Sequence, residues 1–418
     1  MYAAKPSKRE HRVDTMHIEH KKGDIVWDIR HQAPALWRRL DADNVEVDAA
    51  LRDFTHAIPI SPTIDPFDSG PFIRPARHLR AFYCRLDNAV VAIKGSEIYS
   101  PDLQRQLDIL SHYRVDYPSR GRSLLSILEH FPIVEQKIPL AFTRAECEED
   151  IYSALSLQQA HLTHFGELAR LPVPLLMIDW PRERVDSFAE QLLPRLTPRS
   201  QAIVRSQLDD GLATLIYHYP QVPLRVAHMH FCYALDNDYQ ARIHGLCEHL
   251  SPRQTLDRWL DLSARILTLG YMPGSIESVG IGHCLEAQNA VVDGGFVDLG
   301  SIKAMVDITT QREFMETLMM AFIDLSQTMH KFMLGSPVDA VAEYRNPSPA
   351  AMLTCQRVSR ALWQKLADYN STRPLDPRLA RLLENGGLFD QLDLDYRALY
   401  PPLPQSSAHT EAGCSGTG

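Results

Sequence analysis

The stretch over residues 280–301, GIGHCLEAQNAVVDGGFVDLGS, holds several residue types that can bind a charged ligand. It predicts a loop, a short strand, a turn at Asp293-Gly294-Gly295 and a second strand. Such a hairpin would place the Asn289 amide beside the Asp298 carboxylate. Mg²⁺ that carries nucleotide phosphates prefers a few protein oxygens of this kind. The alternative is that both side chains only satisfy backbone groups at turns.

A second group of candidate residues lies upstream. Lys94 ends the apolar run VVAIK, which predicts a strand. A helix is expected from Thr143, because Thr143 and Glu146 have the spacing of a capping box. The first turns of this helix contain Glu148 and Glu149, and either carboxylate could pair with the lysine. Solvation of these charges is the alternative, since such residues are mostly exposed.

In this order the residues resemble the protein-kinase-like superfamily, over about residues 90–305. Members of that superfamily have a lysine on the third strand, a glutamate on the next helix, a metal-binding asparagine and an Asp-x-Gly motif. The resemblance implies that Lys94 binds ATP phosphates and that Glu149 or Glu148 orients it. It also implies that Asn289 and Asp298 hold Mg²⁺.

The same resemblance implies a hinge between two lobes at Asp179-Trp180-Pro181, after the run VPLLMI. Asp179 would then be a nucleotide-binding residue together with Gln288 and Asn289. Lys94, Glu149 and Asp298 would be the catalytic residues.

One departure from the kinase pattern concerns the catalytic base. Kinases have His-Arg-Asp before the metal-binding asparagine, whereas this chain has Gly282-His283-Cys284. The base is therefore Cys284 or absent. A loop without this base looks like that of selenoprotein O-type adenylyltransferases. The segment GIGHCLEAQN is also similar to the G-I-x-x-E-A-H-x-Q-N pattern of siderophore synthetases, and it keeps Gln288 and Asn289 at that spacing.

These resemblances imply an ATP- and Mg²⁺-dependent transferase that moves a phosphoryl or adenylyl group. The acceptor, a small molecule or a protein, is not identified by the sequence. Two alternatives stay open. The missing base favours a catalytically inactive, pseudokinase-type binding protein, and the siderophore synthetase pattern favours an ATP-dependent carboxylate–amine ligase.

Two further features could bind ligands. His228 and His230 could present two imidazoles on one strand face, but no third metal ligand is suggested nearby, which favours buried or paired histidines. Arg225 could reach a phosphate or a carboxylate, although a structural ion pair is the more common fate of such an arginine.

Composition restricts the class of protein. A formal net charge of −9 over 418 residues disfavours binding to nucleic acid through a basic surface. No apolar stretch approaches the ~20 residues of a membrane-spanning helix, so no membrane partner is expected. Seven scattered cysteines without a C-x-x-C pair indicate a reducing, cytoplasmic location.

The predicted fold is α+β and two-lobed. Residues 1–45 are expected to be a flexible leader, 46–180 a strand-rich nucleotide-binding lobe, 181–400 a helical lobe with the metal-binding loop, and 401–418 a disordered tail. Strands are predicted at AFYCRL, AVVAIKG and VPLLMIDW. Helical spacing marks DSFAEQLLPRL, SQAIVRSQLDDGLATLIYHY, TLDRWLDLSARILTLG and residues 312–332.

Overall fold

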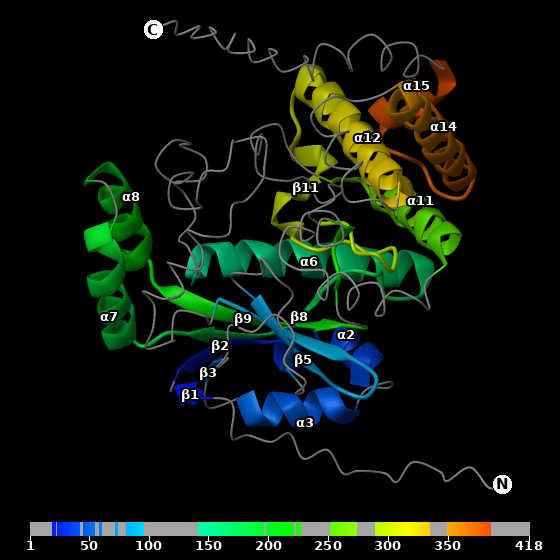
Figure 1. Ribbon diagram of the computed structural model, residues 1–418. Helices are drawn as coiled ribbons and strands as arrows, with labels where there is room; N and C mark the ends of the chain where they lie inside the picture. Colours follow the sequence, from blue (N-terminus) through cyan, green and yellow to red (C-terminus); the bar gives the residue numbers. More distant parts are fainter. Residues whose placement is uncertain are drawn as a thin grey trace, which may run out of the picture.

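The computed structural model describes residues 19–21, 23–41, 45–54, 58–60, 72–73, 81–95, 141–195, 198–220, 223–226, 251–273, 289–334 and 349–385. These residues form a mixed α and β structure built on an antiparallel sheet (Figure 1). The mixed α and β composition agrees with the prediction from sequence.

The sheet has the strand order β2-β8-β9-β6-β5-β4, and β7 also pairs with β9. All of these pairs are antiparallel. Every residue of β9 is buried, because β9 lies inside the sheet and helices cover both faces. The strands are β2 (Asp24–Asp28), β4 (Phe72–Ile73), β5 (Ala81–Arg85), β6 (Val90–Lys94), β7 (Phe142–Thr143), β8 (Val173–Asp179) and β9 (Leu212–Tyr219).

Two shorter strand pairs lie outside this sheet. β1 (Glu19–Lys21) pairs with β3 (Ile58–Ile60), and β10 (Tyr271–Met272) pairs with β11 (Lys303–Ala304). Both pairs are antiparallel.

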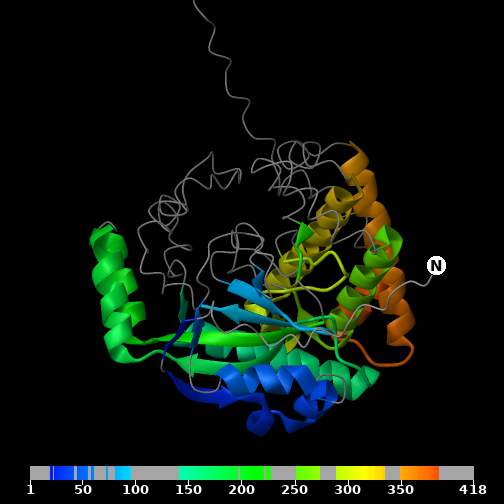
Figure 2. The same ribbon diagram turned by 60° about the horizontal axis from the view of Figure 1, so that its bottom comes forward.

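One face of the sheet is covered by the N-terminal helices. Figure 2 shows the N-terminal helices, in blue, lying across this face. Their apolar residues share a core with every second residue of the strands, such as Ile93 of β6 and Ile216 of β9. The helices of this layer are α1 (Ile29–Gln32), α2 (Pro34–Asp41) and α3 (Val45–Phe54). Between β8 and β9 the chain forms α7 (Arg182–Leu192), the 3₁₀ turn η4 (Leu193–Arg195) and α8 (Pro198–Asp209), which stand at the end of the sheet (Figure 1) and add apolar residues to the same core.

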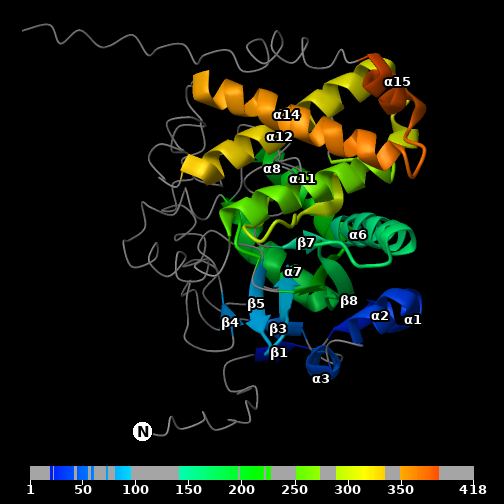
Figure 3. The same ribbon diagram turned by 90° about the vertical axis from the view of Figure 1, so that its right-hand side faces the viewer.

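The opposite face packs on α6 (Arg144–Phe165), and a helical group lies beyond it (Figure 3). In this group α14 packs on both α11 and α12. Trp259, Phe314 and Phe322 are fully buried there. The group consists of α11 (Pro252–Thr268), α12 (Gln311–Leu334), α14 (Pro349–Asn370) and α15 (Pro377–Asn385), with 3₁₀ turns η7 (Leu299–Ser301) and η8 (Met305–Asp307).

Several elements predicted from sequence are confirmed. β5, β6 and β8 lie at the three predicted apolar runs, and α11 and α12 lie at the predicted helical stretches. The Thr143 side chain accepts from the Glu146 backbone at 3.1 Å, and the Glu146 carboxylate accepts from the Thr143 backbone at 3.0 Å, so the capping box is present.

The prediction of a flexible leader over residues 1–45 is wrong for residues 24–41. β2 pairs with β8, and α1 and α2 bury Ile29, Leu36 and Leu40 against the sheet. The averaged composition of this stretch is charged, but the apolar residues of α1 and α2 gather on the side that faces the sheet. The predicted tail at 401–418 lies outside the described residues.

The predicted division at residue 180 is also wrong. The stretch SQAIVRSQLDDGLATLIYHY was expected to be helical throughout, but α8 ends at Asp209 and β9 begins at Leu212. Gly211 separates them with a φ of 92°, a conformation that disfavours other residues. The sheet therefore takes its central strand from the part of the chain assigned to the helical lobe. None of the described helices combines the length and the apolar character needed to cross a membrane.

Candidate functional site

Lys94 is a charged residue in the interior of the protein, with 5% of its surface exposed. It ends β6, where Val90 and Ala92 face the core beneath α6 while Val91 and Ile93 face the opposite core. By this alternation the Lys94 side chain points toward α6. A buried ammonium group needs charged or polar partners, since its desolvation is otherwise very unfavourable.

Two carboxylates supply these partners. The Lys94 Nζ lies 2.7 Å from Oδ1 of Asp298 and 3.3 Å from Oδ2 of Asp150. Asp150 is 56 residues from Lys94 in the sequence, and Asp298 is 204 residues away. Folding thus brings a strand, a helix and a hairpin together at one ammonium group. We call Lys94, Asp150, Asp298, Tyr217 and Arg225 the lysine cluster.

The helix partner of Lys94 differs from the prediction. Glu148 and Glu149 are exposed on α6, and Glu148 instead accepts from Arg144 at 3.0 Å. Each residue turns a helix by about 100°, so Asp150 shares the buried face with Cys147, one turn earlier. The sequence signal for Asp150 was therefore its place on the apolar face of the helix, which the prediction did not use.

The predicted hairpin after residue 288 is present. Ala290 and Phe296 form an antiparallel bridge, and the Val297 backbone donates to the Asn289 carbonyl at 2.8 Å. This pairing places Asn289 across from Val297, the residue before Asp298. Asn289 is buried, and the Asp298 side chain is 41% exposed.

Asp298 has an unusual backbone. Its φ is 56° and its ψ is 66°, the left-handed region, which is uncommon for residues other than glycine. Gly300 follows two residues later, and a Cβ at this position would lie 2.7 Å from Oδ1 of Asp150. Asp298 therefore adopts a left-handed backbone conformation, and Gly300 leaves room for the Asp150 carboxylate. Residues with strained backbones of this kind are often found at functional sites.

The remaining members of the cluster surround these charges. The Tyr217 hydroxyl donates to Asp150 at 2.9 Å, and the Lys94 ammonium lies 5.1 Å from the centre of the Tyr217 ring. Arg225 lies 3.4 Å from Oδ2 of Asp298. Tyr217 comes from β9, so the error that made β9 a helix also hid this residue from the sequence analysis.

The electrostatics of the cluster keep the lysine charged. Burial alone would lower the pKa of Lys94, but attraction to Asp298 and Asp150 outweighs this effect and holds the pKa above its ordinary value. Burial and the nearby Asp150 charge raise the pKa of Tyr217 well above its ordinary value, so this phenol remains a hydrogen-bond donor. Burial also raises the pKa of Tyr83, on the adjacent β5, to about 12.

Asp179 does not lie at a hinge. It ends β8, and the chain then continues into α7 and α8 and returns to the sheet as β9. Its carboxylate accepts from Arg144 at 2.9 Å. Gln288, Cys284, His228 and His230 lie outside the described residues. Within the described residues no three histidine, cysteine or acidic side chains gather in a way that could hold a metal ion.

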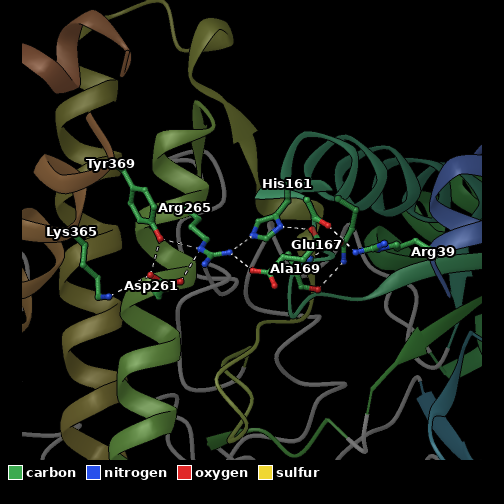
Figure 4. A network of polar contacts seen from close by, with 10 residues as sticks. Arg39, His161, Glu167, Ala169, Asp261, Arg265, Lys365 and Tyr369 are labelled. Atoms are coloured by element: carbon green, nitrogen blue, oxygen red, sulfur yellow. Dashed lines mark hydrogen bonds and ion pairs between the residues drawn. The ribbon is translucent and has the colours of Figure 1, made fainter. Parts of the chain in front are cut away.

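A second polar network holds the far end of α6 (Figure 4). Arg265 of α11 donates to Glu167 at 2.6 Å and pairs with Asp261 at 2.7 Å. The Tyr369 hydroxyl of α14 donates to the same Asp261 at 2.8 Å, and His161 of α6 lies 3.4 Å from Arg265. This arginine network, formed by these five residues, fixes the helix that carries Asp150 against the helical group.

A scan against protein-family models gives no match for this chain, and a search of the curated proteins finds no relative.

Proposed function

We propose that this protein is an ATP- and Mg²⁺-dependent transferase that moves a phosphoryl or adenylyl group to an acceptor. The observation that carries the proposal is the convergence of Asp150 and Asp298 on the buried Lys94. A buried ion pair is weak evidence for stability on its own, because desolvation offsets much of the attraction. Its presence beside a strained aspartate favours a functional role.

Lys94 is suited to anion binding. Because its pKa is raised, it stays protonated at neutral pH, so it acts as a cation and not as a nucleophilic amine. In the proposed reaction this ammonium group neutralises charge on the transferred phosphate, while Asp150 and Tyr217 hold it in place. Charge neutralisation of this kind is a main source of rate in phosphoryl transfer.

The arrangement also fits the kinase-like resemblance. Lys94 ends an antiparallel strand, β6, and α6 provides its carboxylate partner, although β6 is the fourth strand of the sheet in chain order and not the third. The partner is an aspartate, whereas kinases use a glutamate at this place. The Asp-x-Gly motif at Asp298 completes the order expected for the family.

The oxygen atoms of the hairpin suit Mg²⁺. Asp298 offers a partly exposed carboxylate, and Asn289 stands at the base of the same hairpin. When bound there, the ion would neutralise charge on the nucleotide phosphates. The chain's own contribution is to fix Asp298 through its backbone conformation and its two cationic neighbours.

A second candidate function is nucleotide binding without turnover. Oδ1 and Oδ2 of Asp298 each face a cation, Lys94 and Arg225, so this carboxylate is already paired with protein groups. The absence of a kinase-type base from the sequence favours the same candidate. The two candidates share one ligand and differ only in transfer.

Thermal unfolding with ATP, ADP and AMP, each with and without Mg²⁺, tests the shared ligand. Saturation at ~100 times the dissociation constant should stabilise the fold by about 2.7 kcal/mol. An unchanged melting temperature with every nucleotide at millimolar concentration would contradict both candidates.

Transfer is tested with ATP labelled at the α- or γ-phosphate and cell extract as the acceptor source. Movement of the γ-label indicates phosphoryl transfer, and movement of the α-label indicates adenylyl transfer. Asp298→Ala should lower either rate by about 10²- to 10³-fold or more. The variant removes the carboxylate proposed to hold Mg²⁺, which would neutralise the negative charge that develops on the phosphate. Asp307→Ala, at an exposed aspartate on η8, is the control and should transfer normally. Nucleotide binding without transfer of either label would favour the binding protein.

A further inference from the structure

Arg225 lies on a separate segment, residues 223–226, that pairs with the hairpin preceding Asp298. It forms an antiparallel bridge with Val291. On either side the Val226 backbone donates to the Ala290 carbonyl at 2.9 Å, and the Val292 backbone donates to the Leu224 carbonyl at 2.8 Å. The position of Arg225 relative to the hairpin is therefore fixed by backbone hydrogen bonds.

The Arg225 side chain reaches the second oxygen of the Asp298 carboxylate. Its Nη1 lies 3.4 Å from Oδ2, while the Lys94 Nζ lies 2.7 Å from Oδ1, so each oxygen has its own cation. The guanidinium also interacts with Tyr83 of β5, and the Arg225 side chain is only 16% exposed. It is a largely buried arginine held between the sheet and the hairpin.

This arrangement opposes metal binding in the absence of nucleotide. Lys94 and Arg225 carry two positive charges, and Asp150 and Asp298 balance them with two negative charges. A divalent cation that approached Asp298 would be repelled by both cations at short range. A polyphosphate carries several negative charges and would attract the same two cations away from the carboxylate.

We propose that Arg225 is a second phosphate-binding residue of this site and that it acts with Lys94 to prevent Asp298 from binding Mg²⁺ until nucleotide is present. This inference rests on the proposed function. Binding of metal and nucleotide is then strongly coupled, because each relieves the unfavourable charge left by the other. Arginine suits the role since its planar fork fits phosphate oxygens.

Binding of Mn²⁺ and of adenylyl imidodiphosphate, a non-hydrolysable ATP analogue, tests the proposal by calorimetry on the full chain. The wild-type protein should bind Mn²⁺ weakly alone and much more tightly with the analogue. Arg225→Met should weaken binding of the metal-free analogue by roughly 10- to 100-fold, since a charge-assisted hydrogen bond is lost. The same variant should bind Mn²⁺ alone about 10-fold more tightly, since one repelling charge is removed.

Opposite shifts for the two ligands separate a binding role from a structural one. Arg170→Met is the matched control, because Arg170 pairs with Asp293 of the same hairpin at 3.5 Å and is 44% exposed. It should leave both affinities unchanged. Arg225→Lys keeps the positive charge but lacks the planar guanidinium group. It should bind the metal-free analogue better than Arg225→Met, and it replaces that variant in the test if Arg225→Met is too unstable to measure.

Two results would overturn the inference. Loss of affinity for both ligands in Arg225→Met, with Arg225→Lys no better, would show that the arginine only supports the hairpin. Unchanged affinity for both would show that it contacts neither ligand. If the wild-type protein binds no analogue with or without Mn²⁺, the proposed function itself fails together with this inference.

Discussion

The lysine cluster and the arginine network lie at the two ends of α6, and they differ in how far they exclude water. Lys94 and Asp150 have side chains that are 6% and 11% exposed. In the arginine network, Arg265 is 22% exposed, but Asp261 and Glu167 are 32% and 60% exposed. An ion pair that water still solvates contributes little free energy to stability. A charge that is removed from water is strongly destabilising unless it keeps its partner.

The comparison supports the choice of the lysine cluster as the proposed site. The arginine network joins α6 to α11 and α14 through polar side chains at the surfaces of neighbouring helices (Figure 4). Other polar residues on these helices could make similar contacts. The lysine cluster joins three segments at a strained aspartate and a sterically required glycine. Buried charge with such demanding geometry is harder to explain by stability alone.

The largest expected difference concerns the central cation of each network. Lys94→Met leaves Asp150 and Asp298 without their shared partner, and loss of one partner from a buried pair costs about 3–5 kcal/mol. Arg265→Met removes a more exposed cation, 22% against 6% for Lys94, and should cost about 1 kcal/mol. Urea unfolding measures both.

The double variant Lys94→Met/Asp150→Leu is the control for this prediction. It removes one of the stranded carboxylates and should recover part of the stability lost in Lys94→Met. Equal stabilities for Lys94→Met and Arg265→Met would show that the two networks do not differ in the way proposed.

A smaller difference is expected between two glycines, one in each region. Gly300→Ala places a Cβ 2.7 Å from Oδ1 of Asp150, so it should displace this carboxylate and weaken nucleotide binding. Gly166 caps α6 beside the arginine network with a φ of 72° and open space around it. Gly166→Ala should therefore cost about 1 kcal/mol from backbone strain and leave nucleotide binding unchanged.

Binding of the ATP analogue by calorimetry and unfolding in urea distinguish the two glycine variants. If Gly166→Ala reduced nucleotide affinity as much as Gly300→Ala, the arginine network would have to be counted as part of the site.

The smallest expected effect is a pH dependence in the arginine network. Burial lowers the pKa of His161, and Arg265 lowers it further, although the backbone hydrogen bond to Glu167 opposes them. The stability from neutral His161 is therefore present above its ordinary pKa of 6.5 and is lost as the pH falls through its folded-state pKa. The raised pKa of Lys94 acts only on the alkaline side, where stability is lost as the pH rises above 10.5.

His161→Gln should lose less melting temperature than the wild-type protein between pH 7 and pH 5, because glutamine can still donate to the Glu167 carbonyl without titrating. The comparison between variants is needed because burial also lowers the pKa of His218 to about 4, which destabilises the fold over the same range. Identical pH profiles for the two proteins would remove His161 as the cause.

Local patterns in the sequence predicted several elements of the fold correctly. The runs AFYCRL, AVVAIKG and VPLLMIDW are strands, and Thr143 and Glu146 cap α6 as their spacing indicated. The hairpin around Asp293-Gly294-Gly295 was also predicted, because its turn residues act over a few positions. Lys94 and Asp298 were selected from sequence by residue type and order, and the structure brings them to 2.7 Å.

Tertiary structure alone decided the rest. Asp150 and not Glu148 or Glu149 meets Lys94, because the rotation of α6 against the sheet determines which carboxylate faces inward. All eight residues of β9 are buried because the strand lies inside the sheet and is covered on both faces. A run of apolar residues of this kind has no strand alternation, so it was mistaken for part of a helix. The N-terminal residues 24–41 are ordered because β2 pairs with the edge of β8. Pairing between segments that are distant in the sequence cannot be predicted from local composition.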